Sequence, residues 1–206
     1  CLEWYRRGRT PLVLGHEITG EISEIGEDVL GFKKGDRVVV AHHVPCGKCQ
    51  SCLSGHETVC ETLRKTNIIP GGFSEYALVP SINVQKGVFL LPDNVSFEEG
   101  TFVEPLACVL RGQRQARYKK GQSIFVIGCG IAGLLHIILA RFRGASKIFA
   151  LDKDDYRMKK AKEFGADYVF KPDSFSPDKI SKNNESRLPD LVILCTGALD
   201  AIKTAF

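Results

Sequence analysis

The sequence predicts an α/β protein with a β-rich first half and a second half in which strands and helices alternate. Short apolar runs separated by Gly, Pro and Asp fill the first half, whereas longer apolar runs and helical segments that end at glycine follow from residue 123. The change of pattern places a boundary near 100–118. With 206 residues, 44% of them hydrophobic, the chain can bury a sizeable core.

Four short segments of the first half have the composition of β-strands. β-Branched and aromatic residues alternate with polar ones or form short apolar runs, and turn-forming residues separate the segments. Such strands predict a compact β-barrel or sandwich. The segments are EITGEISEIG (17–26), GDRVVVAHH (35–43), GGFSEYALVP (71–80) and VFLLP (88–92).

A helix is expected between the two halves. Ser96 followed by Glu99 matches a capping box in front of an apolar run, which is a signal for the start of a helix. Pro105 interrupts that run, and the residue before a proline is pushed away from helical backbone angles. We therefore expect Glu104 at a break between two elements, where its carboxylate is accessible.

The second half predicts a parallel sheet covered by helices, because its strands are apolar on both faces and alternate with helices that end at Gly144 and Gly165. The polar segment 171–190 is expected to be weakly structured or to hold at most a short helix. The predicted strands are SIFVIG (123–128), KIFALD (147–152), DYVF (167–170) and LVILCTG (191–197).

Charge and composition exclude several classes of function. The 28 basic and 24 acidic residues are well mixed and leave a net charge of +4, which does not indicate nucleic-acid binding. No apolar run reaches the roughly 18 residues of a membrane-spanning helix. Cys108, Cys129 and Cys195 lie in apolar runs, as reduced core thiols do, so we expect a cytoplasmic protein. The only methionine is Met158, so we expect a piece of a longer protein.

One group of four cysteines has the spacing C-x2-C-x2-C-x7-C, at Cys46, Cys49, Cys52 and Cys60. Four thiolates on a short loop can close a tetrahedral shell around a zinc ion. Disulfides fit poorly because the even spacing favours no pairing, and a thioredoxin-like dithiol would have to open a helix in a βαβ unit. A full shell leaves no open position, so we expect a structural zinc site with three bystander histidines, His42, His43 and His56.

Three polar side chains in apolar surroundings indicate a second metal site. His16 and Glu17 lie between the apolar runs LVL and ITG, and Glu104 lies alone in TFVEPLAC. Buried polar groups have to be satisfied, and a divalent cation would satisfy all three. Two simpler interpretations stay open: a partly buried histidine with a salt-bridged glutamate, and a carboxylate that caps backbone amides. An ion that also held a water would make the site open and catalytic.

The segment VIGCGIAG has Gly128, Gly130 and Gly133 in the pattern G-x-G-x-x-G, between an apolar strand and a helix. These glycines allow a pyrophosphate to approach the helix N-terminus. Asp152 ends the next strand, 19 residues after Gly133, where an acid binds the adenosine ribose and disfavours a 2′-phosphate, which favours NAD over NADP. The alternatives are that Asp152 is a helix N-cap and that Arg157 is a solvated helix residue rather than a neighbour of the adenosine.

Together these residues resemble the zinc-containing medium-chain dehydrogenases, in particular the sorbitol/polyol and threonine dehydrogenase branch. The family's motifs occur in order across nearly the whole chain: LVLGHEITGEISEIG, GDRV, the cysteine loop, GGFSEY, EPLAC, G-x-G-x-x-G and FGAD. The resemblance implies a GroES-like β-barrel catalytic domain over 1–103 and a Rossmann NAD-binding domain, a partial doubly wound parallel sheet, over 104–206. Both are expected to be incomplete at their outer ends.

By position, the resemblance implies a role for each candidate. The four cysteines match structural zinc ligands, and His16 matches a catalytic zinc ligand with Glu17 as its neighbouring, sometimes alternate, ligand. Glu104 matches an acid that ligates the zinc directly or through water. The cofactor-binding matches are Ala132, whose backbone meets the cofactor, and Asp152 and Arg157 around the ribose.

The sequence differs from the family pattern at its first residues. The family has a further zinc cysteine within a C-G-x-D-x-H motif, whereas Cys1 lies only fifteen residues before His16 and Trp4 stands where the Asp would be. We expect the true ligand upstream of this chain, although a deletion could make it Cys1.

The implied function is transfer of a hydride from a secondary alcohol, such as a polyol, an amino alcohol or a simple alcohol, to NAD. One structural and one catalytic zinc ion are expected, with a small-molecule alcohol as substrate and a homodimer or homotetramer as the assembly. The alternative is a zinc-stabilised dinucleotide-binding sensor without turnover.

Overall fold

The computed structural model describes residues 12–206. The chain forms two compact units, the first ending at Glu104 and the second running from Pro105 to Phe206. Cys1, a candidate metal ligand, lies outside the described residues. In the described part of the chain, no helix is long and apolar enough to cross a membrane.

The first unit contains an antiparallel sheet with the strand order β1-β2-β3. Successive side chains of a strand point to opposite faces, so Val38 and Val40 of the middle strand share one face. Both are buried there and pack with Ile68. Three of the four strands predicted for this half are thereby confirmed: β1 (Glu17–Glu21), β2 (Arg37–Ala41) and β3 (Val88–Leu90).

The fourth predicted strand, GGFSEYALVP (71–80), is wrong, because the segment makes only an isolated bridge. The amides of Gly72 and Phe73 donate instead to the carbonyls of Gly15 and Leu14. A Cβ at Gly72 would lie 2.9 Å from the carbonyl carbon of Gly15, so a side chain there would prevent this approach. The paired glycines therefore bring the segment against the residues that precede β1.

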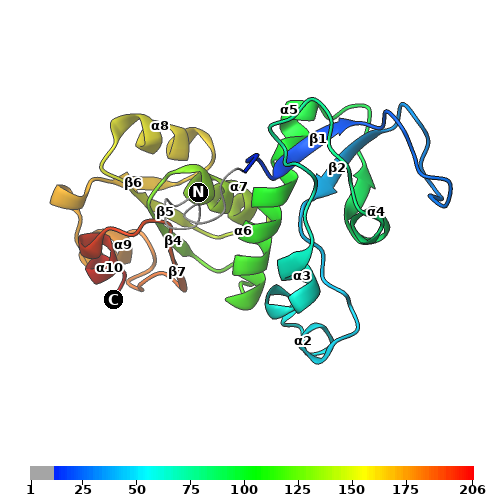
Figure 1. The fold of residues 1–206 in the computed structure, drawn as a ribbon. Coiled ribbons are helices and arrows are strands. Elements are labelled where there is room, and N and C mark those ends of the chain that lie inside the picture. Colours follow the sequence, from blue (N-terminus) through cyan, green and yellow to red (C-terminus); the bar gives the residue numbers. More distant parts are fainter. Residues whose placement is uncertain (1–11) are drawn as a thin grey trace. The chain divides into compact units, whose positions relative to one another are not determined.

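The helices of the first unit are short: α2 (Gln50–Leu53), η1 (Glu57–Val59), α3 (Glu61–Lys65), α4 (Ser81–Gly87) and α5 (Phe97–Thr101). Figure 1 shows α2 and α3, in cyan, apart from β1 and β2 and joined to them by extended segments. The predicted capping box opens α5, because Ser96 Oγ accepts from the amide of Glu99 and the Glu99 carboxylate accepts from the amide of Ser96.

Glu104 lies in the first turn of helix α6 (Val103–Gln115), so its predicted place at a break between elements is wrong. The break is at Phe102, which separates α5 from α6. Pro105 is tolerated in the first turn because the amides there have no partner within the helix. The Glu104 carboxylate consequently lies at a helix N-terminus, where the helix dipole favours negative charge.

The second unit is a parallel sheet covered by helices, as predicted, with the strand order β6-β5-β4-β7. The strands are β4 (Ile124–Ile127), β5 (Ile148–Leu151), β6 (Tyr168–Phe170) and β7 (Leu191–Leu194). Since β4 lies inside the sheet, the chain continues to one side and then crosses to the other, as in dinucleotide-binding α/β folds. Gly144 and Gly165 follow the predicted helices, with φ of 78° and 113°.

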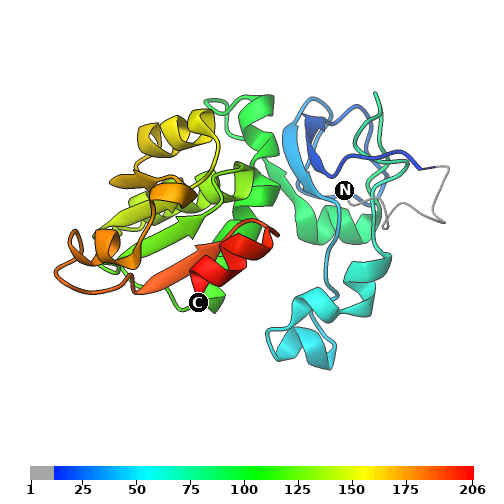
Figure 2. The same ribbon diagram turned by 90° about the vertical axis from the view of Figure 1, so that its left-hand side faces the viewer.

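Alternate residues of β4 face two separate cores. Ile124 and Val126 pack with residues of α7 and α8, whereas Phe125 and Ile127 pack with residues of α9 and α10. Figure 2 shows α8, in yellow, on one side of this sheet and α9 and α10, in orange and red, on the other. The bounds of these helices are α7 (Ile131–Phe142), α8 (Asp155–Glu163), α9 (Pro177–Ser181) and α10 (Leu199–Ala205).

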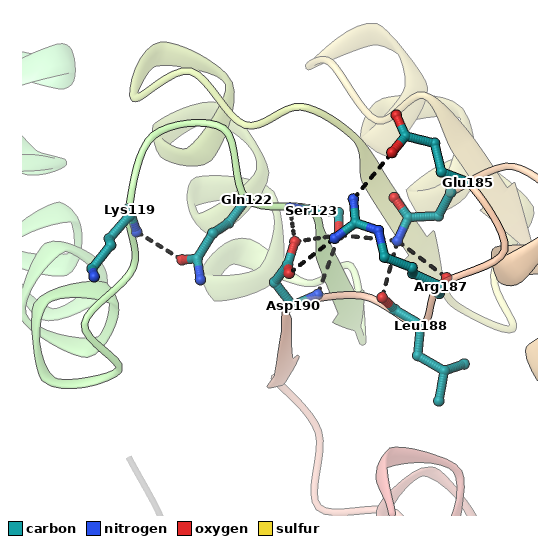
Figure 3. Close-up of polar contacts among 8 residues, drawn as sticks. Lys119, Gln122, Ser123, Glu185, Arg187, Leu188 and Asp190 are labelled. Atoms are coloured by element: carbon teal, nitrogen blue, oxygen red, sulfur yellow. Dashed lines mark hydrogen bonds and ion pairs between the residues drawn. The ribbon is translucent and has the colours of Figure 1, made fainter.

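A polar network ties the start of β4 to the segment before β7 (Figure 3). Ser123 donates its amide and its hydroxyl to one oxygen of Asp190, at 2.7 and 2.8 Å, and these bonds lower the pKa of Asp190. The side chain of Asn184, which is buried, donates to the Ser123 hydroxyl and to two backbone carbonyls. The network fixes the end of the polar segment 171–190, whose regular structure is limited to η2 (Pro172–Ser174) and α9, as predicted.

Candidate metal and cofactor sites

The four cysteine sulfur atoms converge on one point, all within 4.8 Å of one another. The Sγ atom of Cys46 lies 3.9 Å from that of Cys52 and 3.7 Å from that of Cys60, and the Cys49–Cys52 separation is 3.5 Å. A tetrahedral site with S–Zn distances of about 2.3 Å has S–S edges of about 3.8 Å. The four cysteines form no disulfides, and the separations of their sulfur atoms fit a tetrahedral zinc ion.

Backbone amides surround two of these sulfurs and favour their thiolate form. The amides of Lys48 and Cys49 donate to Sγ of Cys46 at 3.4 and 3.3 Å, and the amide of Cys46 donates to Sγ of Cys60. These bonds lower the pKa of Cys46, and amide donors lower the pKa of Cys60 to about 6. Burial raises the pKa of Cys52 to about 12, so a cation is needed to hold this sulfur as a thiolate.

His16, Glu17 and Glu104 form a second group, with one ligand atom from each within 4.8 Å of the others. Nε2 of His16 lies 4.0 Å from Oε2 of Glu104. An ion held at about 2.1 Å from each ligand can join atoms up to about 4.2 Å apart, so this pair is within reach of a zinc ion. The same separation is at the outer limit of an ion pair. The side chains are 42% and 24% exposed, so a small ligand can reach them.

The backbone before β1 is shaped by close contact with the glycine-rich segment 71–73. Gly15 has a φ of 96°, and a Cβ there would lie 2.8 Å from the amide nitrogen of Phe73. A cavity of about 300 Å³ lies beside His16 and Glu17, and the other side chains in its wall are apolar. Space for a small molecule therefore exists next to two of the candidate ligands.

Two histidines that the sequence marks only as bystanders form a row with His16, in which His42 contacts His16 and His43 contacts His42. The ring centroid of His42 is 4.7 Å from that of His16 and 4.0 Å from that of His43. Burial, together with His43 and His16, lowers the pKa of His42 to about 4, so its ring is neutral at pH 7. His56 is exposed in the cysteine loop. No sequence motif identifies His42 as a neighbour of His16. The antiparallel register of β1 and β2 places the two residues opposite each other.

The glycine-rich loop between β4 and α7 has the close backbone contacts that a dinucleotide site requires. Gly128 has a φ of 94°, and a Cβ at Gly133 would lie 1.9 Å from the carbonyl oxygen of Gly128. Gly130 is the N-cap of α7, and a Cβ there would meet no described atom within 4 Å. The helix N-terminus therefore faces open space, where its free amides can bind a pyrophosphate.

Asp152 fastens this loop to the end of β5. It is 6% exposed, and its carboxylate accepts from the amide of Cys129 at 2.7 Å and from the amide of Asp154 at 2.9 Å. The N-cap of α8 is Asp154, whose side chain accepts from the amide of Arg157, so the N-cap interpretation of Asp152 is wrong. Arg157 on α8 and Ala132 on α7 are both exposed.

Two parts of the chain match known protein families. Residues 2–93 match the family described as alcohol dehydrogenase GroES-like domain. Residues 132–206 match the family described as zinc-binding dehydrogenase. The first match falls on the half of the chain with the metal groups. The second falls on the half with the glycine-rich loop.

Individual relatives agree with these matches. The chain is 38% identical over 176 residues to L-threonine 3-dehydrogenase of Pyrococcus furiosus, covering 82% of this chain and 48% of that protein. It is 32% identical over 203 residues to D-xylulose reductase A of Aspergillus oryzae, covering 95% and 56%. A solved alcohol dehydrogenase of Escherichia coli CFT073, complexed with NADH, superimposes with a TM-score of 0.78 at 30% identity, covering 97% and 59%. The chain thus spans about half the length of its relatives.

Proposed function

Because the chain belongs to the family of zinc-binding, medium-chain alcohol dehydrogenases, we propose that the protein containing it transfers a hydride from a secondary alcohol to NAD. The observation that carries this proposal is the convergence of His16, Glu17 and Glu104 within 4.8 Å beside a cavity. A histidine and one or two carboxylates leave ligand positions open on a zinc ion, as a catalytic site requires.

The two metal groups would have different roles. Cys46, Cys49, Cys52 and Cys60 fill a tetrahedral shell and would hold a structural ion that fixes the loop containing α2 and α3. His16, with Glu104 and with Glu17 as a second or alternate ligand, would hold the catalytic ion. When bound, that ion would act as a Lewis acid on the alcohol hydroxyl, and NAD would accept the hydride.

The chain's own residues would orient the reactants. The wall of the cavity beside His16 is mostly apolar, so it would exclude water from the carbon skeleton of the alcohol. The loop from Gly128 to Gly133 would bind the cofactor pyrophosphate through the free amides of α7. Asp152 would hold that loop in shape and accept hydrogen bonds from the ribose. Ala132 on α7 and Arg157 on α8 are both exposed and would contact the cofactor through the Ala132 backbone and the Arg157 side chain.

The substrate is proposed by class. One relative is named for L-threonine and another for D-xylulose, which favours an amino alcohol, a polyol or a related secondary alcohol. A homodimer or homotetramer in the cytoplasm is the assembly and location that we predict from the sequence.

Replacing Glu104 by glutamine tests the catalytic assignment. We expect kcat/KM for NAD⁺ reduction by the intact protein to fall at least about tenfold, since the site loses an anionic ligand or its water-holding acid. The matched control is Glu27→Gln, because Glu27 is exposed in the turn between β1 and β2 and belongs to neither group of ligands. A wild-type protein that reduces no NAD⁺ with any polyol, amino alcohol or simple secondary alcohol would show that the proposal is wrong.

The second candidate is a dinucleotide-binding sensor without turnover, and the self-contained cysteine group is the observation that favours it. Metal content separates the two proposals. About two zinc ions per chain in the intact protein would support the enzyme, whereas one ion would support the sensor.

A further inference from the structure

The pairing of β1 with β2 sets His16 opposite His42. The antiparallel register pairs Glu17 with Ala41, so one further step pairs the residue before β1 with the residue after β2. Directly opposite side chains of an antiparallel pair lie within contact distance. The two imidazole rings meet edge to face, with centroids 4.7 Å apart and planes inclined by 61°. The contact therefore follows from the register of the sheet.

His42 is backed in turn by His43, whose ring centroid is 4.0 Å away. Nδ1 of His43 forms a hydrogen bond with the backbone carbonyl of Thr66, the residue that follows α3. The hydroxyl of Thr66 accepts from the amide of Val44 at 3.0 Å, which binds the same two segments a second time. Three imidazoles thus form a row that ends on a fixed backbone carbonyl.

A buried asparagine holds the backbone of the same segment. The side chain of Asn83 is 0% exposed and donates from Nδ2 to the carbonyls of Ala41 and His42, both at 3.0 Å. Helix α4 comes this close because Gly87 has no side chain. A Cβ there would lie only 2.6 Å from Cγ1 of Val44. The backbone of His42 and its ring are consequently held by different partners.

We propose that His42 is a positioning residue for the metal-binding imidazole of His16, and that its support through His43 and Thr66 couples this site to the cysteine loop. The inference rests on the proposed function, which assigns an ion to His16, Glu17 and Glu104. The His16 side chain is 42% exposed, so without the neighbouring ring it could adopt orientations that face away from the other ligands. Residues that orient metal ligands typically contribute about ten- to hundredfold in metal affinity.

The cysteine loop lies in sequence between His43 and Thr66, the two residues that support His42. Cys46 follows four residues after His42, and Cys60 directly precedes α3, which ends before Thr66. The His43–Thr66 bond therefore closes the base of the loop. Removing the ion from the cysteines would therefore make the segments that contain His43 and Thr66 less rigid. We expect this to weaken metal binding at His16, although the cysteines supply no ligand there.

Cobalt(II) titration of the metal-free intact protein tests the proposal, because thiolate ligands give intense charge-transfer absorption and nitrogen–oxygen ligands give weaker visible bands. We expect His42→Ala to weaken cobalt binding at the His16 group by about tenfold or more. His42→Phe should keep most of the affinity, since it retains a ring beside His16. His43→Phe should weaken it as well, because it retains the ring but loses the bond to Thr66. His56→Ala, an exposed histidine of the same loop, is the matched control.

The outcomes separate this inference from the proposed function. If the wild type binds cobalt at two sites, and His42→Ala and His43→Phe bind it at the His16 group as tightly as His56→Ala does, the inference is overturned and the proposed function stands. A wild type that binds cobalt only at the cysteines overturns both. If His42→Ala fails to fold, the comparison of His43→Phe with His56→Ala decides alone.

Discussion

Replacing Gly133 by alanine should displace the glycine-rich loop. The new Cβ would lie 1.9 Å from the carbonyl oxygen of Gly128, whereas real contacts shorter than 3.0 Å essentially do not occur, so the two atoms must separate by about 1.1 Å. The obstacle is backbone, which cannot rotate away as a side chain does. Overpacking of this kind costs about 1–3 kcal/mol, and the better helix propensity of alanine offsets up to about 1 kcal/mol. We expect a net loss of about 1–2 kcal/mol in the free energy of unfolding.

Gly130→Ala is the matched variant. Gly130 and Gly133 belong to the same motif, but a Cβ at Gly133 would meet backbone atoms whereas a Cβ at Gly130 would not. Its φ is −71°, which alanine adopts readily, and the added methyl group would meet no described atom within 4 Å. Its free energy of unfolding should therefore stay within about 0.5 kcal/mol of the wild-type value. The methyl group would, however, project into the space before the N-terminus of α7, so we expect NAD affinity to fall about tenfold or more.

Urea unfolding and NAD titration of the intact protein, followed by fluorescence, measure both effects. Gly133→Ala should lose stability and NAD affinity together, whereas Gly130→Ala should lose only NAD affinity. The reasoning is refuted if Gly133→Ala is as stable as the wild type, because the loop geometry would then be incorrect. It is refuted equally if Gly130→Ala binds NAD as tightly as the wild type, because the pyrophosphate would then not approach this turn.

Two further predictions concern the metal loop and the acid sensitivity of the second unit. Cys60→Ser should remove one zinc ion per chain by elemental analysis and lower the free energy of unfolding by about 4 kcal/mol. Cys108 is exposed, so its expected place in the core is wrong, and Cys108→Ser should leave the zinc content unchanged. Bonds from Ser123 hold the pKa of Asp190 below its unfolded value of about 3.9, so the stabilisation is present above that pH and is lost as the pH falls through the folded-state pKa. In urea unfolding at pH 7 and at lower pH, Asp190→Asn should be less stable than the wild type at pH 7 and should lose less on acidification; an equal loss in both proteins would contradict the assignment.

The second unit could be predicted almost completely, because its signals are local. Apolar runs four residues long mark β4 and β5, and Gly144 and Gly165 mark the ends of the helices. The cysteine group is local in the same sense, since four ligands on one short loop identify a site without knowledge of the fold. The structure adds that these sulfurs lie at the separations of a tetrahedron.

The features that escaped prediction depend on partners distant in sequence. The segment 71–80 alternates like a strand, but its amides bond to residues before β1, which no local pattern reveals. His42 has no motif, and only the register of β1 with β2 sets it beside His16. Glu104 was misplaced for a different reason, because a proline in the first turn of a helix does not end it.

The two bonds of Asp152 have a consequence for attempts to change the cofactor preference of such a protein. Exchanging this acid for a neutral residue is the direct way to admit the 2′-phosphate of NADP, since it removes a repelling charge. Here the same exchange would also release the amides of Cys129 and Asp154, which the carboxylate holds at the turn before α7 and at the start of α8. A variant engineered for NADP would therefore lose at least one of these bonds. Serine or asparagine at position 152 keeps one acceptor oxygen and is a better starting point than glycine or alanine.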